Sequence, residues 1–157
     1  MNRDNNFQCD SESKHRVMEA LKKAYAPNIF TYEIDKNPKA IIDCRAIGIT
    51  KDNKTIHYAV EIKHRNFTAD KYDSYYCEPN KYDELNFETI HNGVDRAYIA
   101  NEFSDGSIYL WNINDIDRFD IVKVKIARTT VGIGNYLSQK IEQDRLLMPI
   151  EKGIKIK

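Results

Sequence analysis

One continuous segment reads Ala40-Ile-Ile-Asp-Cys-Arg-Ala-Ile-Gly-Ile49, then Thr50-Lys-Asp-Asn-Lys54, then Thr55-Ile-His-Tyr-Ala-Val-Glu-Ile-Lys63. The two outer runs are rich in β-branched residues and the middle run is polar, which predicts an antiparallel hairpin. If the turn centres near Asp52, Asp43 lies opposite Glu61. Directly opposed residues on one face have Cβ atoms roughly 4.5–5.5 Å apart. Two carboxylates at that spacing could share one hard divalent cation.

Strand alternation assigns the neighbouring side chains to two faces, because residues two apart point the same way. Glu61 and Lys63 point together, and Tyr58, Val60 and Ile62 point to the opposite side. We expect the apolar side to pack against a core. The charged pair is then expected to lie outside the buried half of the strand.

The length of 157 residues fits one domain, covering residues 1–157 with a core of about 13–128 and irregular residues 1–10. Lys and Arg total 24, and Asp and Glu also total 24. The chain therefore has no global electrostatic signature of nucleic-acid binding, and any such binding must rest on a local patch.

Membrane and secretory signals are missing from the sequence. The amino terminus lacks an apolar run, and no stretch approaches the roughly 20 apolar residues that a membrane span needs. Three widely spaced cysteines favour reduced thiols and argue against a structural zinc site. We expect a cytoplasmic protein with no membrane partner.

The remaining pattern alternates helices and strands. A helix is expected after the first ten residues, capped by Ser11 or Ser13 and stopped by Pro27, and a second from Pro79 to the Asn92-Gly93 terminator. Strands are expected over 29–34, 40–49, 55–63, 96–101, 107–113 and 121–126. A helical pattern follows from residue 136 to 146, and residues 150–157 alternate like an edge strand. The fold class predicted is α/β, a mixed central β-sheet flanked by helices with an α-β-β-β-α-β core and extra C-terminal strands.

Asp43 and the tripeptide Glu61-Ile62-Lys63, set in that order of elements over residues 13–102, resemble the PD-(D/E)xK nuclease superfamily. Its restriction-endonuclease-like fold is shared by many restriction enzymes, Holliday junction resolvases and phage or repair nucleases. Ile42 stands where the motif's name has proline, a position that varies widely in the superfamily.

The resemblance implies catalytic roles for Asp43, Glu61 and Lys63. Asp43, Glu61 and the backbone carbonyl of Ile62 would hold Mg²⁺ or Mn²⁺ through oxygen ligands. Lys63 would orient or deprotonate the attacking water, or stabilise the transition state. Many members also carry an acid on the first helix. Glu12 and Glu19 lie away from the apolar face of that helix, and Asp10 fits only if the helix begins early, so this role stays unassigned.

Basic and aromatic residues follow the motif. His64, Arg65 and Lys71, interleaved with Phe67 and several tyrosines, could line a nucleic-acid groove through phosphate contacts and stacking. The alternative is a polar loop whose tyrosines half-cover the sheet. Lys81, on the second helix, is a further candidate for phosphate contact, with a solvated helix lysine as its alternative.

The function expected is metal-dependent hydrolysis of phosphodiester bonds in DNA by an enzyme of phage, mobile-element or repair origin. DNA is favoured over RNA by the resemblance, and many members work as homodimers. The first rival is a non-catalytic nucleic-acid-binding or assembly domain that keeps the fold. The second is an unrelated fold in which Asp43 and Glu61 are exposed and form a salt-bridge ladder with Arg45 and Lys63.

Overall fold

A six-stranded mixed sheet forms the centre of the molecule. The structure, a computed structural model, describes residues 3–37, 39–127 and 140–157. The strand order is β1 (Ile29–Ile34), β2 (Cys44–Ile49), β3 (Thr55–Arg65), β5 (Arg96–Phe103), β6 (Ile108–Asn112) and β9 (Ile154–Lys155). Only β3 and β5 are parallel neighbours, and the chain between them includes a helix, as a parallel connection requires. The predicted fold class is confirmed.

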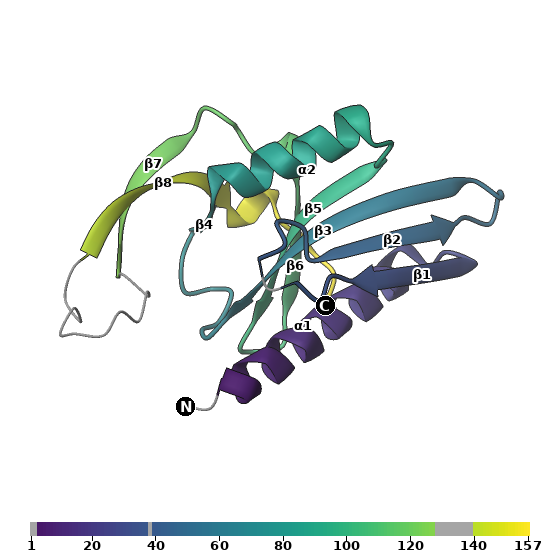
Figure 1. Cartoon of the computed structure of the whole chain (residues 1–157), viewed down its shortest axis with the longest axis horizontal. Helices are drawn as coiled ribbons and strands as arrows, with labels where there is room; N and C mark the ends of the chain where they lie inside the picture. The colour runs from purple at the N-terminus through teal and green to yellow at the C-terminus, as the bar shows by residue number, and fades with distance from the viewer. Residues whose placement is uncertain (1–2, 38, 128–139) are drawn as a thin grey trace.

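Two helices cover opposite faces of this sheet (Figure 1). Helix α1 (Arg3–Tyr25) packs Val17, Met18 and Leu21 against one face, and α2 (Pro79–His91) packs Leu85 against the other. The start of α1 at Arg3 corrects the expectation of irregular structure for residues 3–10, and residues 1–2 lie outside the described residues. Glu61 is 2% exposed, so the expectation that the charged pair lies outside the buried half of the strand is wrong for Glu61.

A second sheet of three strands extends from the first (Figure 1). Its order is β4 (Ser74–Cys77), β8 (Lys140–Pro149) and β7 (Ile121–Ala127). Residues 140–146 are therefore strand where a helical pattern was expected. Leu146 and Met148 alternate into the core while both edges of β8 pair with neighbours. The first part of that expected helix, residues 136–139, lies outside the described residues.

The predicted hairpin forms with the predicted register. Cys44 pairs with Val60, and extending this register by one residue sets Asp43 opposite Glu61. The strand begins at Cys44 rather than residue 40, so Asp43 lies directly before β2. Its carbonyl accepts the Asp35 N–H. The Asp43 side chain is thereby held at the end of the sheet ladder.

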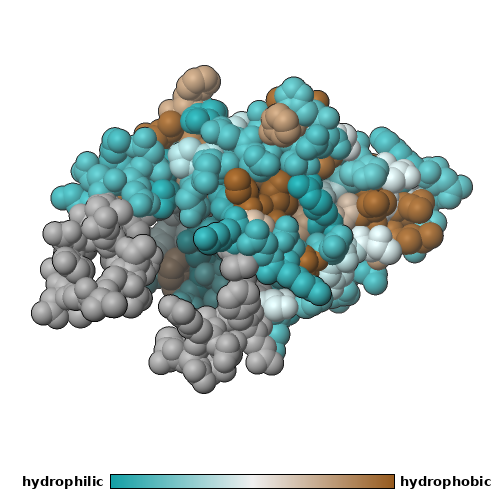
Figure 2. All heavy atoms as spheres, viewed as in Figure 1, coloured by the Kyte–Doolittle hydropathy of each residue, from teal (hydrophilic) through white to brown (hydrophobic). Residues whose placement is uncertain are grey.

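Residues 154–155 form the expected edge strand beside β6. In the view of Figure 2 most of the surface is hydrophilic, and apolar residues gather in separate patches. Neither described helix combines the length and the apolar character that crossing a membrane requires.

Candidate active site

Asp43 is held by contacts from two other elements. Its Oδ2 accepts the backbone N–H of Ile62 in β3 at 2.8 Å. Its Oδ1 lies 2.7 Å from the Nζ of Lys14, a side chain of α1 that is 7% exposed. Asp43 is thus a fixed carboxylate between the helix and the central strand.

Glu61 is the most deeply buried acid of the site, at 2% exposure. Its Oε1 lies 3.0 Å from Lys81 Nζ and 3.4 Å from Lys63 Nζ. Its Oε2 is buried and has no hydrogen-bond partner in the described part of the chain. Burial first, and then the charge of Asp43, raise the pKa of Glu61 to about 7 against the opposing pull of the two lysines. One carboxylate oxygen is therefore available to a ligand.

Lys63 and Lys81 connect the carboxylates to the start of α2. Lys63 Nζ lies 3.5 Å from Oε1 of Glu78, the residue before α2. Lys81 Nζ donates to the backbone carbonyls of Ala40 at 3.2 Å and Ile41 at 2.9 Å. Lys81 is 15% exposed, so the alternative of a solvated helix lysine is wrong. Its present contacts fix the segment that leads into Asp43.

The exposed salt-bridge ladder expected by the rival interpretation does not form, although Lys63 lies 3.4 Å from Glu61. Arg45 pairs with Glu88 of α2, at 2.6 Å and 3.0 Å, instead of with the hairpin acids. Asp43 pairs with Lys14, and Glu61 is buried. The acids of the hairpin are therefore not an exposed cross-strand network.

His64 lies on the other side of β3, away from Glu61. Its Nδ1 is 3.0 Å from Glu102, which also accepts hydrogen bonds from Ser13 and Arg16 of α1. Burial alone would raise the pKa of Glu102, but hydrogen bonds from Arg16, Ser13 and His64 lower it to about 2. Glu102 thus joins α1 to the sheet, and His64 contacts the same carboxylate. The structure does not bring His64 together with the other predicted residues.

The predicted basic residues after the motif lie in two places, Arg65 at the end of β3 and Lys71 in a cluster of aromatic rings. Arg65 is the last residue of β3, on the side of Glu61 and Lys63. Lys71 Nζ lies 5.0 Å from the centre of the Phe67 ring, which stacks on the buried Tyr75. Tyr75 covers the core, as the alternative interpretation expected of the tyrosines. The structure does not bring Lys71 into the carboxylate site.

Lys14 is a site residue that the sequence interpretation missed. It lies at helical spacing from Met18 and Leu21, on the buried face of α1. A lysine on an apolar helix face needs a buried partner, and that was the available signal. The early start of α1 also meets the condition set for Asp10, although its side chain lies outside those the structure describes.

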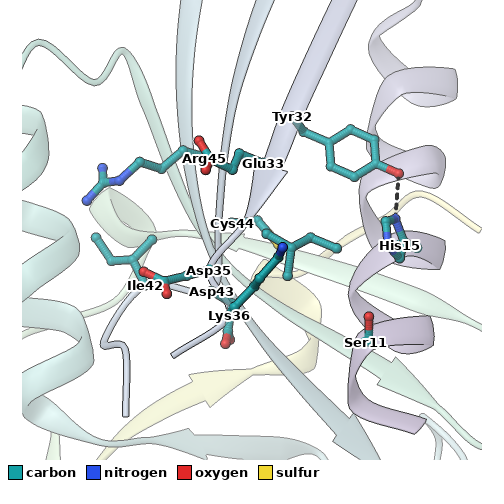
Figure 3. A pocket seen from close by; sticks show the side chains of 11 residues that line it. Ser11, His15, Tyr32, Glu33, Asp35, Lys36, Ile42, Asp43, Cys44 and Arg45 are labelled. Carbon is teal, nitrogen blue, oxygen red and sulfur yellow. Dashed lines mark hydrogen bonds between the residues drawn. The ribbon is translucent and has the colours of Figure 1, made fainter. Parts of the chain in front are cut away.

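A cleft of about 750 Å³ reaches Asp43 from the side of α1 and β1. Figure 3 shows His15 of α1 and Tyr32 of β1 across it, joined by a 2.9 Å hydrogen bond, with Asp35 and Asp43 nearby. The lining is mixed in charge and includes Lys36. Asp43 therefore lines this cleft, whereas Glu61 is not part of its lining.

The donor chemistry fits the divalent cation that the resemblance implies. Asp43 and Glu61 supply hard oxygen donors, and the unpartnered Oε2 of Glu61 is a vacant acceptor in a buried place. No group of three or more His, Cys, Asp and Glu side chains at metal-binding spacing occurs among the described residues. The remaining ligands would have to be backbone oxygens, water or substrate. The Ile62 carbonyl as a ligand stays a prediction.

A comparison with solved structures identifies the same fold in a Holliday junction resolvase. The 1.6 Å structure of Hjc, a Holliday junction resolvase from the archaeal hyperthermophile Archaeoglobus fulgidus, matches 93% of this chain and 95% of its own. The TM-score is 0.54 and the sequence identity 15%. No protein-family model and no curated protein sequence matches the chain. The likeness shows that the chain has the restriction-endonuclease-like fold that its resemblance to the PD-(D/E)xK superfamily implied.

Proposed function

We propose that this protein is a metal-dependent nuclease that hydrolyses phosphodiester bonds in DNA. The observation that carries the proposal is the buried, unpartnered Oε2 of Glu61 beside Asp43, with Lys63 on the same carboxylate. Leaving a buried carboxylate oxygen unpaired costs free energy, and a ligand-binding role explains why it persists. The fold shared with a Holliday junction resolvase supports DNA as the substrate.

Each side chain has a role that its position supports. Asp43 and Glu61 would hold Mg²⁺ or Mn²⁺, which acidifies water and offsets charge on the phosphate when bound. Lys63 is 31% exposed and can orient the attacking water or donate to a phosphate oxygen. The water oxygen bonds to phosphorus, the bond to the leaving oxygen breaks, and that oxygen takes up a proton. Lys81 holds Glu61 and the segment before Asp43 in place.

A non-catalytic nucleic-acid-binding domain is the second candidate, and one contact favours it. Lys14 lies 2.7 Å from Asp43 Oδ1 and offsets its charge without a metal. Three lysines then surround two carboxylates. In that case binding would survive chelation and substitution of Asp43 or Glu61.

The deciding experiment incubates the protein with plasmid, linear and branched DNA, and with RNA, in Mg²⁺ or Mn²⁺. EDTA and Lys63→Ala are the negative controls, and Lys123→Ala removes a lysine that is exposed and paired with Asp144. The proposal expects cleavage that is lost with EDTA and Lys63→Ala and kept with Lys123→Ala. Absence of cleavage on every substrate, together with binding that resists EDTA, would favour the second candidate.

A further inference from the structure

A small cavity lies beside the carboxylates, where β3 meets the second sheet. Its volume is about 280 Å³, and its lining is Lys63, Arg65, Tyr76, Glu78, Val124 and Arg145. Three of these residues carry positive charge and one carries negative charge. The cavity is therefore a local basic site in a chain whose charges balance overall.

Arg65 has an unused donor in this cavity lining. One terminal nitrogen donates to the carbonyl of Tyr76 at 3.1 Å. Its Nε is buried and has no hydrogen-bond partner among the residues that the structure describes. Burial lowers the pKa of Arg65, because the guanidinium has lost part of its hydration. An anion that accepts from Nε would offset that cost.

Arg145 brings a second guanidinium from β8. It donates to the Asp144 carbonyl and to the Gln143 side chain, both in its own strand. Within the described residues, no carboxylate lies at ion-pair distance from Arg145 or Arg65. Two guanidinium groups on different sheets thus share one cavity, and Glu78 is the one carboxylate in its lining, within electrostatic reach of both but not at ion-pair distance from either.

Lys63 links the cavity to the carboxylates. Its Nζ lies 3.4 Å from Glu61 Oε1 and 3.5 Å from Glu78 Oε1, and it also lines the cavity. An anion in the cavity would therefore lie next to the site of hydrolysis. At about 30 Å³ per water, the cavity holds roughly nine waters, which is room for a tetrahedral anion and several waters.

We propose that this cavity binds a backbone phosphate of the nucleic-acid strand, adjacent to the phosphate that is cut, through Arg65 and Arg145. Guanidinium groups match phosphate oxygens in charge and in geometry. The inference rests on the proposed nuclease function. It locates the positive patch that a chain of balanced charge needs to hold a polyanion.

The test measures DNA binding by fluorescence anisotropy in EDTA, so that no cleavage occurs. Wild type, Arg145→Gln, Arg145→Lys and the control Arg118→Gln are compared over a range of salt concentrations. Arg118 is an arginine outside the cavity that pairs with Asp83. Arg145→Gln should weaken binding about tenfold, as for one charge-assisted contact. It should also reduce the salt slope by about 0.9, whereas Arg145→Lys and Arg118→Gln keep the slope.

A second readout identifies the phosphate. A series of DNA strands carries one neutral methylphosphonate in place of each phosphate in turn. A methylphosphonate at one position of the strand should weaken DNA binding by the wild type and by Arg118→Gln. The same methylphosphonate should not further weaken DNA binding by Arg145→Gln. Circular dichroism confirms that the variants are folded.

The outcomes separate this inference from the nuclease proposal. Equal binding by Arg145→Gln and Arg118→Gln, or methylphosphonate effects identical in both, would overturn the phosphate site even if the protein cleaves DNA. A thermal shift by inorganic phosphate that depends on Arg145, without any DNA coupling, would overturn it as well. Position-specific coupling in a protein that cuts nothing would support the site and contradict the nuclease.

Discussion

Substitution of Glu61 by glutamine should change how stability depends on pH. Glu61 is 2% exposed, and its pKa is raised from 4.5 to about 7 by burial and by Asp43. The folded state therefore holds a proton that the unfolded chain releases at lower pH. By linkage, this group makes the wild type lose stability as pH rises from about 4.5 to about 7.

The magnitude follows from the shift. One pH unit of pKa difference is worth about 1.4 kcal/mol, so a change from 4.5 to about 7 corresponds to roughly 3 kcal/mol. Between pH 5 and pH 8 most of this difference, about 2–3 kcal/mol, is expressed. Glutamine carries no charge at either pH. The free energy of unfolding of Glu61→Gln minus that of the wild type should therefore be higher at pH 8 than at pH 5 by about 2–3 kcal/mol.

The assay is urea unfolding in EDTA, followed by the fluorescence of Trp111. This residue is the only tryptophan and is fully buried, so its emission reports loss of the core. Glu142→Gln, at an exposed position of β8, serves as the control and should follow the wild type at both pH values. The contrary result is a relative stability of Glu61→Gln that stays the same or falls between pH 5 and pH 8. It would show that the lysines stabilise a charged Glu61 and that the pKa of Glu61 is not raised.

Three further results are expected. Lys14→Met and Asp43→Asn should each destabilise the protein by several kcal/mol, because each removes one partner of a buried ion pair. Urea unfolding of the double variant should show less loss than the sum, and strict additivity would contradict a direct pair. The pKa of Glu102 is lowered to about 2, so its charged form stabilises the wild type above pH 4.5 and this stability is lost as pH falls toward 2. Glu102→Gln should lack this contribution, which is on the order of 2–3 kcal/mol. Acid titrations of the two proteins should converge at low pH, and parallel curves would argue against this. Mn²⁺ or Mg²⁺ should raise the melting temperature of the wild type at neutral pH and leave that of Glu61→Gln nearly unchanged. An equal rise in both would place the metal elsewhere.

Local patterns were sufficient to predict the hairpin and the second helix. Alternating β-branched residues around a polar turn specify both strands, and the predicted pairing of Asp43 with Glu61 agrees with the observed register. Pro79 at the start of α2 is another local signal. Elements of this kind are predictable because neighbours in sequence determine them.

Contacts between distant segments account for what was missed. Residues 140–146 have a period that reads as helix, but β4 and β7 supply a partner for each edge of β8, and no pattern within the segment shows this. The burial of Glu61 likewise depends on α2, from which Lys81 reaches it. The pairing of Lys14 with Asp43 joins residues that are far apart in sequence. The contact of His64 with Glu102, its parallel neighbour, likewise could not be read from the sequence, and its nucleic-acid role stays a prediction.

We propose above that Asp43 and Glu61 form a metal-dependent nuclease site. The most direct measurement is cleavage of branched and linear DNA in Mn²⁺ by wild type, Glu61→Gln and Lys123→Ala, each checked for folding by Trp111 fluorescence. We expect cleavage by wild type and Lys123→Ala and a loss of at least a hundredfold in Glu61→Gln, as for removal of a main electrostatic group. Cleavage by Glu61→Gln at the wild-type rate would contradict it.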